Sequence, residues 1–200
     1  MLVDSHCHID FAEPDERPAL IDRARAAGVA TMLTIGTKAE ELPEVIEIAS
    51  SDPDIWATVG IHPHEAQATP DTIMDRLVDM VAQPKVIGIG ETGLDFHYDH
   101  RPRERQEQWF RAQCRLARAA GLPLIVHSRN ADVETAAILA DEGISRGVIH
   151  CFSTSRALSE PALALGFHIS ISGIVTFKNA DELRDIVTEI PLERLLIETD

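Results

Sequence analysis

Short runs of apolar and β-branched residues recur along the whole chain, and each run is bounded by polar or turn-forming residues. Many of these runs are continuously apolar, which is typical of strands that are buried on both faces of a parallel sheet. The pattern therefore predicts eight strands, over residues 2–6, 30–36, 55–61, 85–91, 123–127, 147–150, 167–173 and 195–200.

Helical patterns fill the intervals between the predicted strands. The segments ERPALIDRARAAG and RERQEQWFRAQCRLARAAG end at Gly28 and Gly121, and glycine is common just past a helix C-terminus. In TPDTIMDRLVDMVA, Thr69 is a candidate cap and Pro70 suits the first turn. Alternating strands and helices predict an α/β fold, a (β/α)8 barrel of the TIM type. A doubly wound open sheet is disfavoured because no Gly-x-Gly-x-x-Gly motif follows the first strand.

Domain organisation follows from the uniformity of the chain. Residues 1–200 contain no linker, low-complexity stretch or shift in composition, and we interpret them as a single barrel domain. The last apolar run ends at Asp200, so the predicted barrel lacks the final helix after its eighth strand. We therefore expect a C-terminally truncated version of a longer chain, or a partner that covers the gap. No obligate protein partner is otherwise indicated.

Composition narrows the classes of function. The formal net charge of −15 excludes a protein that coats nucleic acid through counterion release, and 4% aromatic residues disfavour an extended base-stacking surface. Cys7, Cys114 and Cys151 are odd in number and scattered, which indicates reduced thiols. Since there is no signal-peptide pattern and no apolar run near the ~20 residues of a membrane helix, we expect a cytoplasmic protein without membrane contact.

Candidate chemistry collects where the predicted strands end, which is where barrels of this kind build their active sites. Seven of the nine histidines, all but His100 and His168, lie at or just past a strand end. A single such histidine is more often a hydrogen-bonded, partly buried residue than a ligand, but the set is stronger than its members. The polar residues at these ends are His6, His8, His62, His64, Glu91, Asp95, His127, Arg129, His150 and Asp200.

Several imidazoles and two carboxylates at one mouth are costly to bury together without a cation. Nitrogen and carboxylate ligands suit zinc, manganese, iron or nickel, and magnesium with several waters remains an alternative. Six ligands favour two divalent ions per chain that share a carboxylate and a bridging water nucleophile. We assign the shared carboxylate to Glu91. Asp200 is a second catalytic candidate, because a carboxylate beside that water can accept its proton.

Phosphate contacts must come from few residues in so acidic a chain. Lys178 and Arg129 are cations on the expected rim, although the alternative for each is a solvated surface charge. His62 and His64 are weaker candidates for the same role. Phe152 and Phe177 are candidates to stack on a terminal base, with core packing as the alternative.

Six motifs in order, DSHCHID, GETGLD, VHSRNA, IHCFS, GIVTFKNA and LIETD, resemble the signature of the TatD family of metal-dependent deoxyribonucleases, within the amidohydrolase-like barrels. The resemblance extends from residue 3 to residue 200. It implies that His6, His8 and Asp200 bind a first metal, that His127 and His150 bind a second, and that Glu91 bridges the two. It also implies 3′ to 5′ hydrolysis of DNA or RNA phosphodiesters.

Three hypotheses about function follow. The first is a divalent-metal-dependent, 3′–5′ exodeoxyribonuclease-like hydrolase whose substrates are DNA or RNA ends. The second is a two-metal hydrolase of a small ester, lactone, amide or aminoacyl-tRNA ester at the same mouth. The third is a catalytically silent binder of metal or nucleic acid.

Overall fold

The eight predicted strands are all present, and they follow one another around the sheet in chain order. The computed structural model describes residues 1–97 and 102–200, so His100 lies outside the described residues. Every neighbouring pair from β1 to β8 is parallel. The strands are β1 (Leu2–Cys7), β2 (Val29–Thr34), β3 (Ile55–Val59), β4 (Val86–Asp95), β5 (Leu124–Arg129), β6 (Gly147–Ile149), β7 (His168–Ile171) and β8 (Leu195–Ile197).

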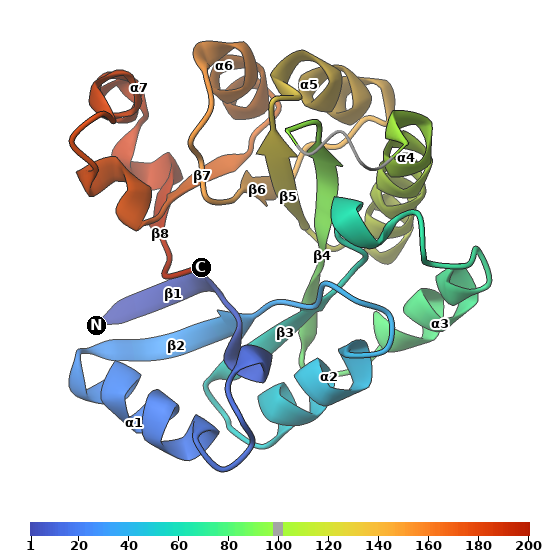
Figure 1. Ribbon diagram of the computed structural model, residues 1–200, viewed down its shortest axis with the longest axis vertical. Helices are drawn as coiled ribbons and strands as arrows, with labels where there is room; N and C mark the ends of the chain where they lie inside the picture. The colour runs from blue at the N-terminus through green and yellow to red at the C-terminus, as the bar shows by residue number, and fades with distance from the viewer. Residues whose placement is uncertain (98–101) are drawn as a thin grey trace.

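Helices connect successive strands and surround the sheet (Figure 1). Together the strands and helices form a nearly closed (β/α)8 barrel, which confirms the predicted fold. The helices are α1 (Arg17–Ala26), α2 (Leu42–Ser50), α3 (Ile73–Met80), α4 (Arg103–Ala120), α5 (Asp132–Asp141), α6 (Arg156–Ala164) and α7 (Asp181–Glu189), with single turns η1 (Ile9–Phe11), η2 (Pro63–Glu65), η3 (Gly173–Thr176) and η4 (Leu192–Arg194).

Helix ends follow the sequence signals in part. Helix α4 ends at Ala120 and is capped by Gly121, whose φ of 67° is left-handed and suits glycine, as the sequence predicts. The prediction of a cap at Thr69 is wrong, because α3 begins only at Ile73. The hydroxyl of Thr69 instead donates to the carbonyl oxygen of Glu65, so this residue closes the turn that follows η2.

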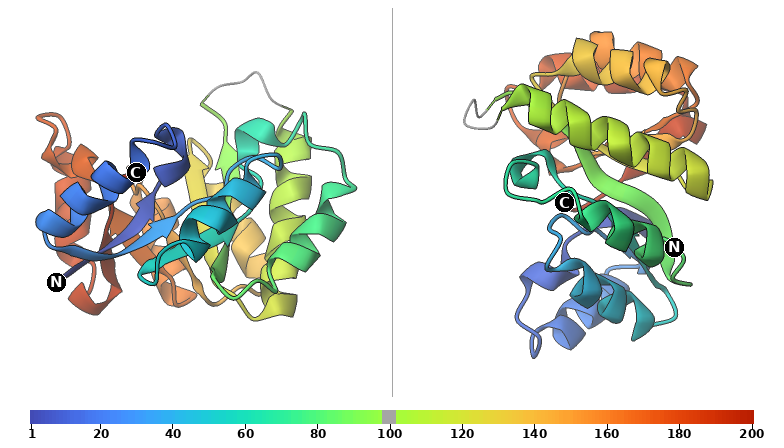
Figure 2. Two further views of the ribbon diagram at one scale, coloured as in Figure 1. Left: turned by 90° about the horizontal axis from the view of Figure 1, so that it is seen from below. Right: turned by 90° about the vertical axis from the view of Figure 1, so that its right-hand side faces the viewer.

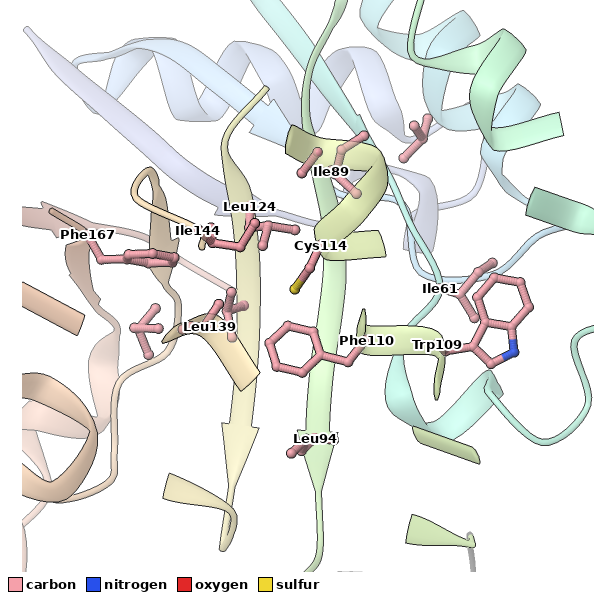
Figure 3. Packing of buried hydrophobic residues seen from close by; sticks show 14 of the residues in the cluster. Ile61, Ile89, Leu94, Trp109, Phe110, Cys114, Leu124, Leu139, Ile144 and Phe167 are labelled. Carbon is pink, nitrogen blue, oxygen red and sulfur yellow. The ribbon is translucent and has the colours of Figure 1, made fainter. Parts of the chain in front are cut away.

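The largest contribution to the core between helix and sheet comes from α4. Phe110 and Cys114 are fully buried, and Figure 3 shows them facing the strands that carry Leu94 and Leu124. Trp109, on the same helix, is 4% exposed. This packing fixes α4 against β4 and β5, two of the strands that end at the functional mouth.

The barrel closes between β8 and β1 through side chains and a terminal backbone contact. The hydroxyl of Ser5 lies 2.8 Å from that of Ser170 and donates to the carbonyl oxygen of Ile197 at 3.0 Å. The amide of Asp200 donates to the carbonyl oxygen of His6 at 3.0 Å. No described helix covers the outer face of this seam, so Val3 and Ile197 are about half exposed, at 53% and 51%.

The carboxyl ends of the strands gather at one end of the barrel. In the left view of Figure 2, η1 and the C-terminal end of the chain lie at the upper end, and the N-terminus lies lower. Across the described part of the chain, none of the helices combines the length and apolar character that crossing a membrane requires.

Candidate metal centre

A cavity of about 660 Å³ opens at the carboxyl ends of the strands. It collects nine of the ten polar strand-end residues that the sequence singles out, while His6 lies fully buried beneath them. The nine are His8, His62, His64, Glu91, Asp95, His127, Arg129, His150 and Asp200.

The first cluster in this cavity joins the end of β1 to the end of the chain. The Nε2 atoms of His6 and His8 lie 3.2 Å apart, as expected for residues i and i+2 of a strand, which face the same side. Asp200 Oδ1 lies 3.5 Å from His6 Nε2 and 3.9 Å from His8 Nε2. Glu91 Oε2 approaches the same two nitrogens at 3.5 and 4.0 Å. His6, His8 and Asp200 therefore present three ligand atoms within 4.8 Å of one another, and Glu91 approaches both histidines.

The second cluster lies around the other carboxylate oxygen of Glu91. Oε1 is 2.8 Å from His150 Nε2, 3.0 Å from His127 Nδ1 and 3.3 Å from His62 Nε2. Glu91 itself is only 4% exposed. One buried carboxylate thus directs each of its oxygens to a different group of histidines.

Asp95 extends the second cluster, although the sequence gives it no role. Its side chain is 1% exposed, and Oδ2 lies 2.8 Å from His64 Nε2 and 3.2 Å from His127 Nε2. The signal for Asp95 is present in the sequence, because it follows Glu91 by an even number of residues on one strand and so shares its face. His127 is held between two carboxylates, Glu91 at Nδ1 and Asp95 at Nε2.

Two buried glutamines of α4 hold the strand ends that carry these groups. Gln106 accepts from the amide of Asp95 at 2.8 Å and donates to its carbonyl oxygen at 3.0 Å. Gln113 makes the same pair of bonds with Ile61, the residue before His62, and also donates to Thr92. The apolar face of this helix in the sequence already includes Gln113, although not its contact with Ile61. Gln106 was missed because glutamine on a helix is usually exposed.

Close packing of β4 on β5 brings Glu91 and His127 together. Gly93 has a φ of 140°, and a Cβ atom at this position would overlap the carbonyl oxygen of His127. Only glycine permits this approach.

A further side chain connects β1 to the end of the chain. Asp4 is buried, and its carboxylate accepts from the amide of His6 at 3.3 Å, the amide of Thr199 at 3.1 Å and the hydroxyl of Thr199 at 2.6 Å. Asp4 therefore holds the residue next to Asp200 against the strand that carries His6. This contact joins residues at opposite ends of the sequence, so no local sequence pattern predicts it.

The protonation equilibria show a site with buried negative charge. Burial lowers the pKa of His6 to about 4, so this imidazole is neutral at pH 7. Burial also disfavours the charged form of His127, but its hydrogen bonds to Asp95 and Glu91 outweigh this and raise its pKa to about 9. Burial opposes ionisation of Glu91 as well, yet the neighbouring His150 and His62 hold the pKa of its carboxyl well below the usual range.

The donor set fits divalent metal ions. Among the described residues, every ion-pair partner of Glu91 is a histidine, so no permanent cation compensates this buried carboxylate. Around an ion bound at about 2.1 Å, adjacent ligands lie about 3.0 to 3.4 Å apart. The spacings around Glu91, from 2.8 to 4.0 Å, are close to this range. Three groups have ligand atoms within 4.8 Å of one another: His6, Glu91 and His150; His6, His8 and Asp200; and His62, Glu91 and His127.

Only some of the residues that the sequence suggests as phosphate or base contacts line the cavity. Arg129 lines the cavity, whereas Lys178 is exposed on the segment after η3 and is not among the described residues that line it. Lys38, on the segment after β2, does line the cavity and was missed because it lies four residues beyond its strand. Phe152 is 2% exposed and packs in the core, while Phe177 is 57% exposed.

The chain is similar to a known protein family and to several of its members. Residues 3–200 match the family described as TatD related DNase. The metal-dependent hydrolase YabD of Bacillus subtilis (strain 168) is 36% identical over 203 residues, which cover 100% of this chain and 80% of YabD. The 3′–5′ ssDNA/RNA exonuclease TatD of Rahnella sp. (strain Y9602) is 39% identical over 189 residues, covering 92% of this chain and 72% of that protein.

A solved structure agrees closely with the barrel. The crystal structure of YjjV, a TatD homologue from Escherichia coli K12, superimposes with a TM-score of 0.94 at 33% identity. The alignment covers 100% of this chain and 78% of YjjV.

Proposed function

Since this chain belongs to the family of TatD-related DNases, we propose that it is a divalent-metal-dependent 3′–5′ exonuclease acting on the ends of single-stranded DNA or RNA. The observation that carries the proposal is the position of Glu91. Its Oε2 faces His6 and His8, and its Oε1 faces His127 and His150. A carboxylate with both oxygens engaged in this way suits a pair of neighbouring ions.

Each ligand has a defined place in this proposal. His6, His8 and Asp200 would hold the first divalent ion, His127 and His150 would hold the second, and Glu91 would be shared between them. Zinc, manganese, nickel and magnesium are the candidate metals. Bound at this site, two such ions would supply Lewis acidity toward the scissile phosphate and a water nucleophile active at neutral pH.

Other side chains of this protein would bind the substrate and accept the proton of the attacking water. Arg129, His62 and His64 line the cavity and are proposed to contact the phosphate oxygens of the terminal nucleotide. Asp200 is 36% exposed at its side chain, so it can accept the proton of the attacking water and pass it on toward the leaving oxygen or to solvent.

His62 has two possible roles, metal ligand or phosphate contact, and replacement of its side chain distinguishes them. Its Nε2 atom lies 3.3 Å from Glu91 Oε1, close enough for His62 to serve as a metal ligand instead of a phosphate contact. Replacement His62→Ala should leave the metal content unchanged and weaken substrate binding if His62 contacts phosphate. Loss of an ion from the variant would make His62 a ligand.

The test of the proposal is a directional cleavage assay. Metal-free protein is reconstituted separately with zinc, manganese, nickel or magnesium and incubated with one strand labelled at either end. A 5′-labelled strand should shorten stepwise, and a 3′-labelled strand should release labelled mononucleotide at once. The variant Glu91→Gln is the matched inactive control. Hydrolysis of small esters or lactones without strand cleavage would favour the small-substrate hydrolase, and strand binding without turnover would favour the silent binder.

A further inference from the structure

One aromatic side chain at the mouth of the cavity remains without a role in the proposed chemistry. Phe11, at the end of η1, is 67% exposed, whereas Phe110, Phe152 and Phe167 are at most 2% exposed. It is also one of the residues that line the cavity. A large apolar ring that is exposed to water beside a ligand cavity is available to a ligand.

The orientation of the Phe11 ring is fixed by stacking on a neighbouring imidazole. It stacks on the imidazole of His8 with ring centroids 4.5 Å apart and an angle of 9° between the planes. One face of the ring is therefore covered by His8, which belongs to the first cluster around Glu91. The rest of the ring contributes to the cavity surface, within one residue layer of the proposed metal site.

The backbone around Phe11 is clamped from both sides. Arg17 donates to the carbonyl oxygen of Ala12 at 2.9 Å and to that of Asp10 at 3.2 Å, the two residues that flank Phe11. Its guanidinium is in turn held by Glu44 of α2 at 2.7 Å. The exposed ring is thus preorganised, which reduces the entropy that a ligand must remove on binding.

We propose that Phe11 is a stacking platform for the base of the 3′-terminal nucleotide. This proposal rests on the exonuclease function proposed above. Stacking on a fixed phenyl ring suits a base of any sequence, because every base offers a π-face. With the base on Phe11, the phosphate of the same nucleotide would lie toward the first cluster, and Lys38, which also lines the cavity, would offer it a positive charge.

Phe177 is the rival platform and provides a matched variant. It is exposed to a similar degree, at 57%, but it lines a separate hollow of about 240 Å³ that shares Ser153 and Ile174 with the main cavity. Phe11 and Phe177 therefore permit the same truncation to alanine at two exposed aromatic positions, of which only one stacks on a proposed metal ligand.

The experiment compares two single strands that are identical except at the 3′ end, where one carries thymine and the other an abasic sugar. Phosphorothioate linkages near the end suppress cleavage, and the affinity of metal-loaded protein for each strand is measured by fluorescence anisotropy. The wild-type protein should prefer the thymine strand by about fivefold to a hundredfold. Phe11→Ala should reduce the preference to less than about twofold, Phe11→Trp should retain it, and Phe177→Ala should leave it as in the wild type.

Other outcomes would overturn the platform. Equal affinity of the wild type for the two strands would overturn it while leaving the exonuclease function intact, as judged by directional cleavage of an ordinary strand. Loss of the preference in Phe177→Ala alone would transfer the role to Phe177. A fall in the bound metal of Phe11→Ala, with both strands weakened equally, would show that Phe11 only supports His8. Failure of the wild type to bind either strand would overturn the platform together with the exonuclease function.

Discussion

The two sides of Glu91 are built by different parts of the barrel. We call His6, His8 and Asp200 the first half-site, and His62, His127 and His150 the second half-site. In the second half-site, His127 is oriented by Asp95, and Asp95 is held by Gln106 of α4. In the first half-site, the Nδ1 atoms of His6 and His8 are buried without a hydrogen-bond partner in the described part of the chain, and in the second half-site the same holds for Nδ1 of His150.

This difference has a structural origin. The second half-site is connected through His127 and Asp95 to the packed core between α4, β4 and β5, which fixes the orientation of His127 before any ion binds. The first half-site is assembled across the seam between β8 and β1, where Asp4 and Thr199 join residues that are 195 positions apart. His127 is therefore preorganised by a second-layer carboxylate, whereas the first half-site depends on barrel closure.

The largest expected effect is the simultaneous loss of metal binding at both half-sites. Replacement Glu91→Gln removes the negative charge that faces both clusters, so we expect the affinity for both proposed ions to fall by more than about 100-fold. His127→Ala should chiefly empty the second half-site. Calorimetric titration combined with elemental analysis of dialysed protein measures both variants. An equal loss of metal in the two variants would contradict the bridging role of Glu91.

The next largest effect is a loss of metal affinity that should be confined to the second half-site. Asp95→Asn preserves the size of the side chain but removes the charge that orients His127 and His64. We expect a loss of about 10- to 100-fold in the affinity of one ion, with the other unchanged. Stepwise titration with manganese, followed by its paramagnetic resonance signal, resolves the two binding events. If both events weaken together, the two half-sites are not supported independently.

A comparable test for the first half-site uses the seam. Asp4→Asn keeps an acceptor for one amide but disturbs the contacts that hold Thr199, so the proposed ion between His6 and Asp200 should bind about tenfold more weakly. Ser5→Ala is the matched control, because Ser5 hydrogen-bonds to Ser170 and Ile197 in the same seam, whereas Thr199 is held by Asp4. Equal metal loss in both variants would assign the effect to general loosening of the seam.

The sequence predicted the barrel and the polar strand ends for a physical reason. Strand periodicity and helix caps are local signals, and in a parallel barrel all carboxyl ends meet at one mouth, so side chains such as His127 and His150 could be brought together without coordinates. The contacts between individual atoms of distant segments, in contrast, are not determined by local sequence signals. The clamp of Asp4 on Thr199 and the contact of Gln113 with Ile61 depend on register and on helix placement, which no short motif encodes. Thr69 was misassigned because its hydroxyl has two acceptable partners, a helix start or the preceding turn.

The smallest expected effect concerns the two lysines, which differ in position relative to the half-sites. Lys38 lines the cavity and its ammonium is 2.8 Å from Glu41, whereas Lys178 lies exposed after η3. An exposed charge near a bound phosphate contributes modestly, so Lys38→Ala should weaken the binding of a single strand about three- to tenfold without changing the metal content.

For Lys178→Ala, a change below about twofold is expected, because Lys178 is exposed and is not among the described residues that line the cavity, so water and salt screen its charge. The measurement is strand affinity at low and moderate salt, since a direct phosphate contact steepens the salt dependence. A larger loss for Lys178→Ala than for Lys38→Ala would restore the substrate contact that the sequence predicts at Lys178. It would also mean that the strand crosses the rim on the side of β7 instead of the side of β2.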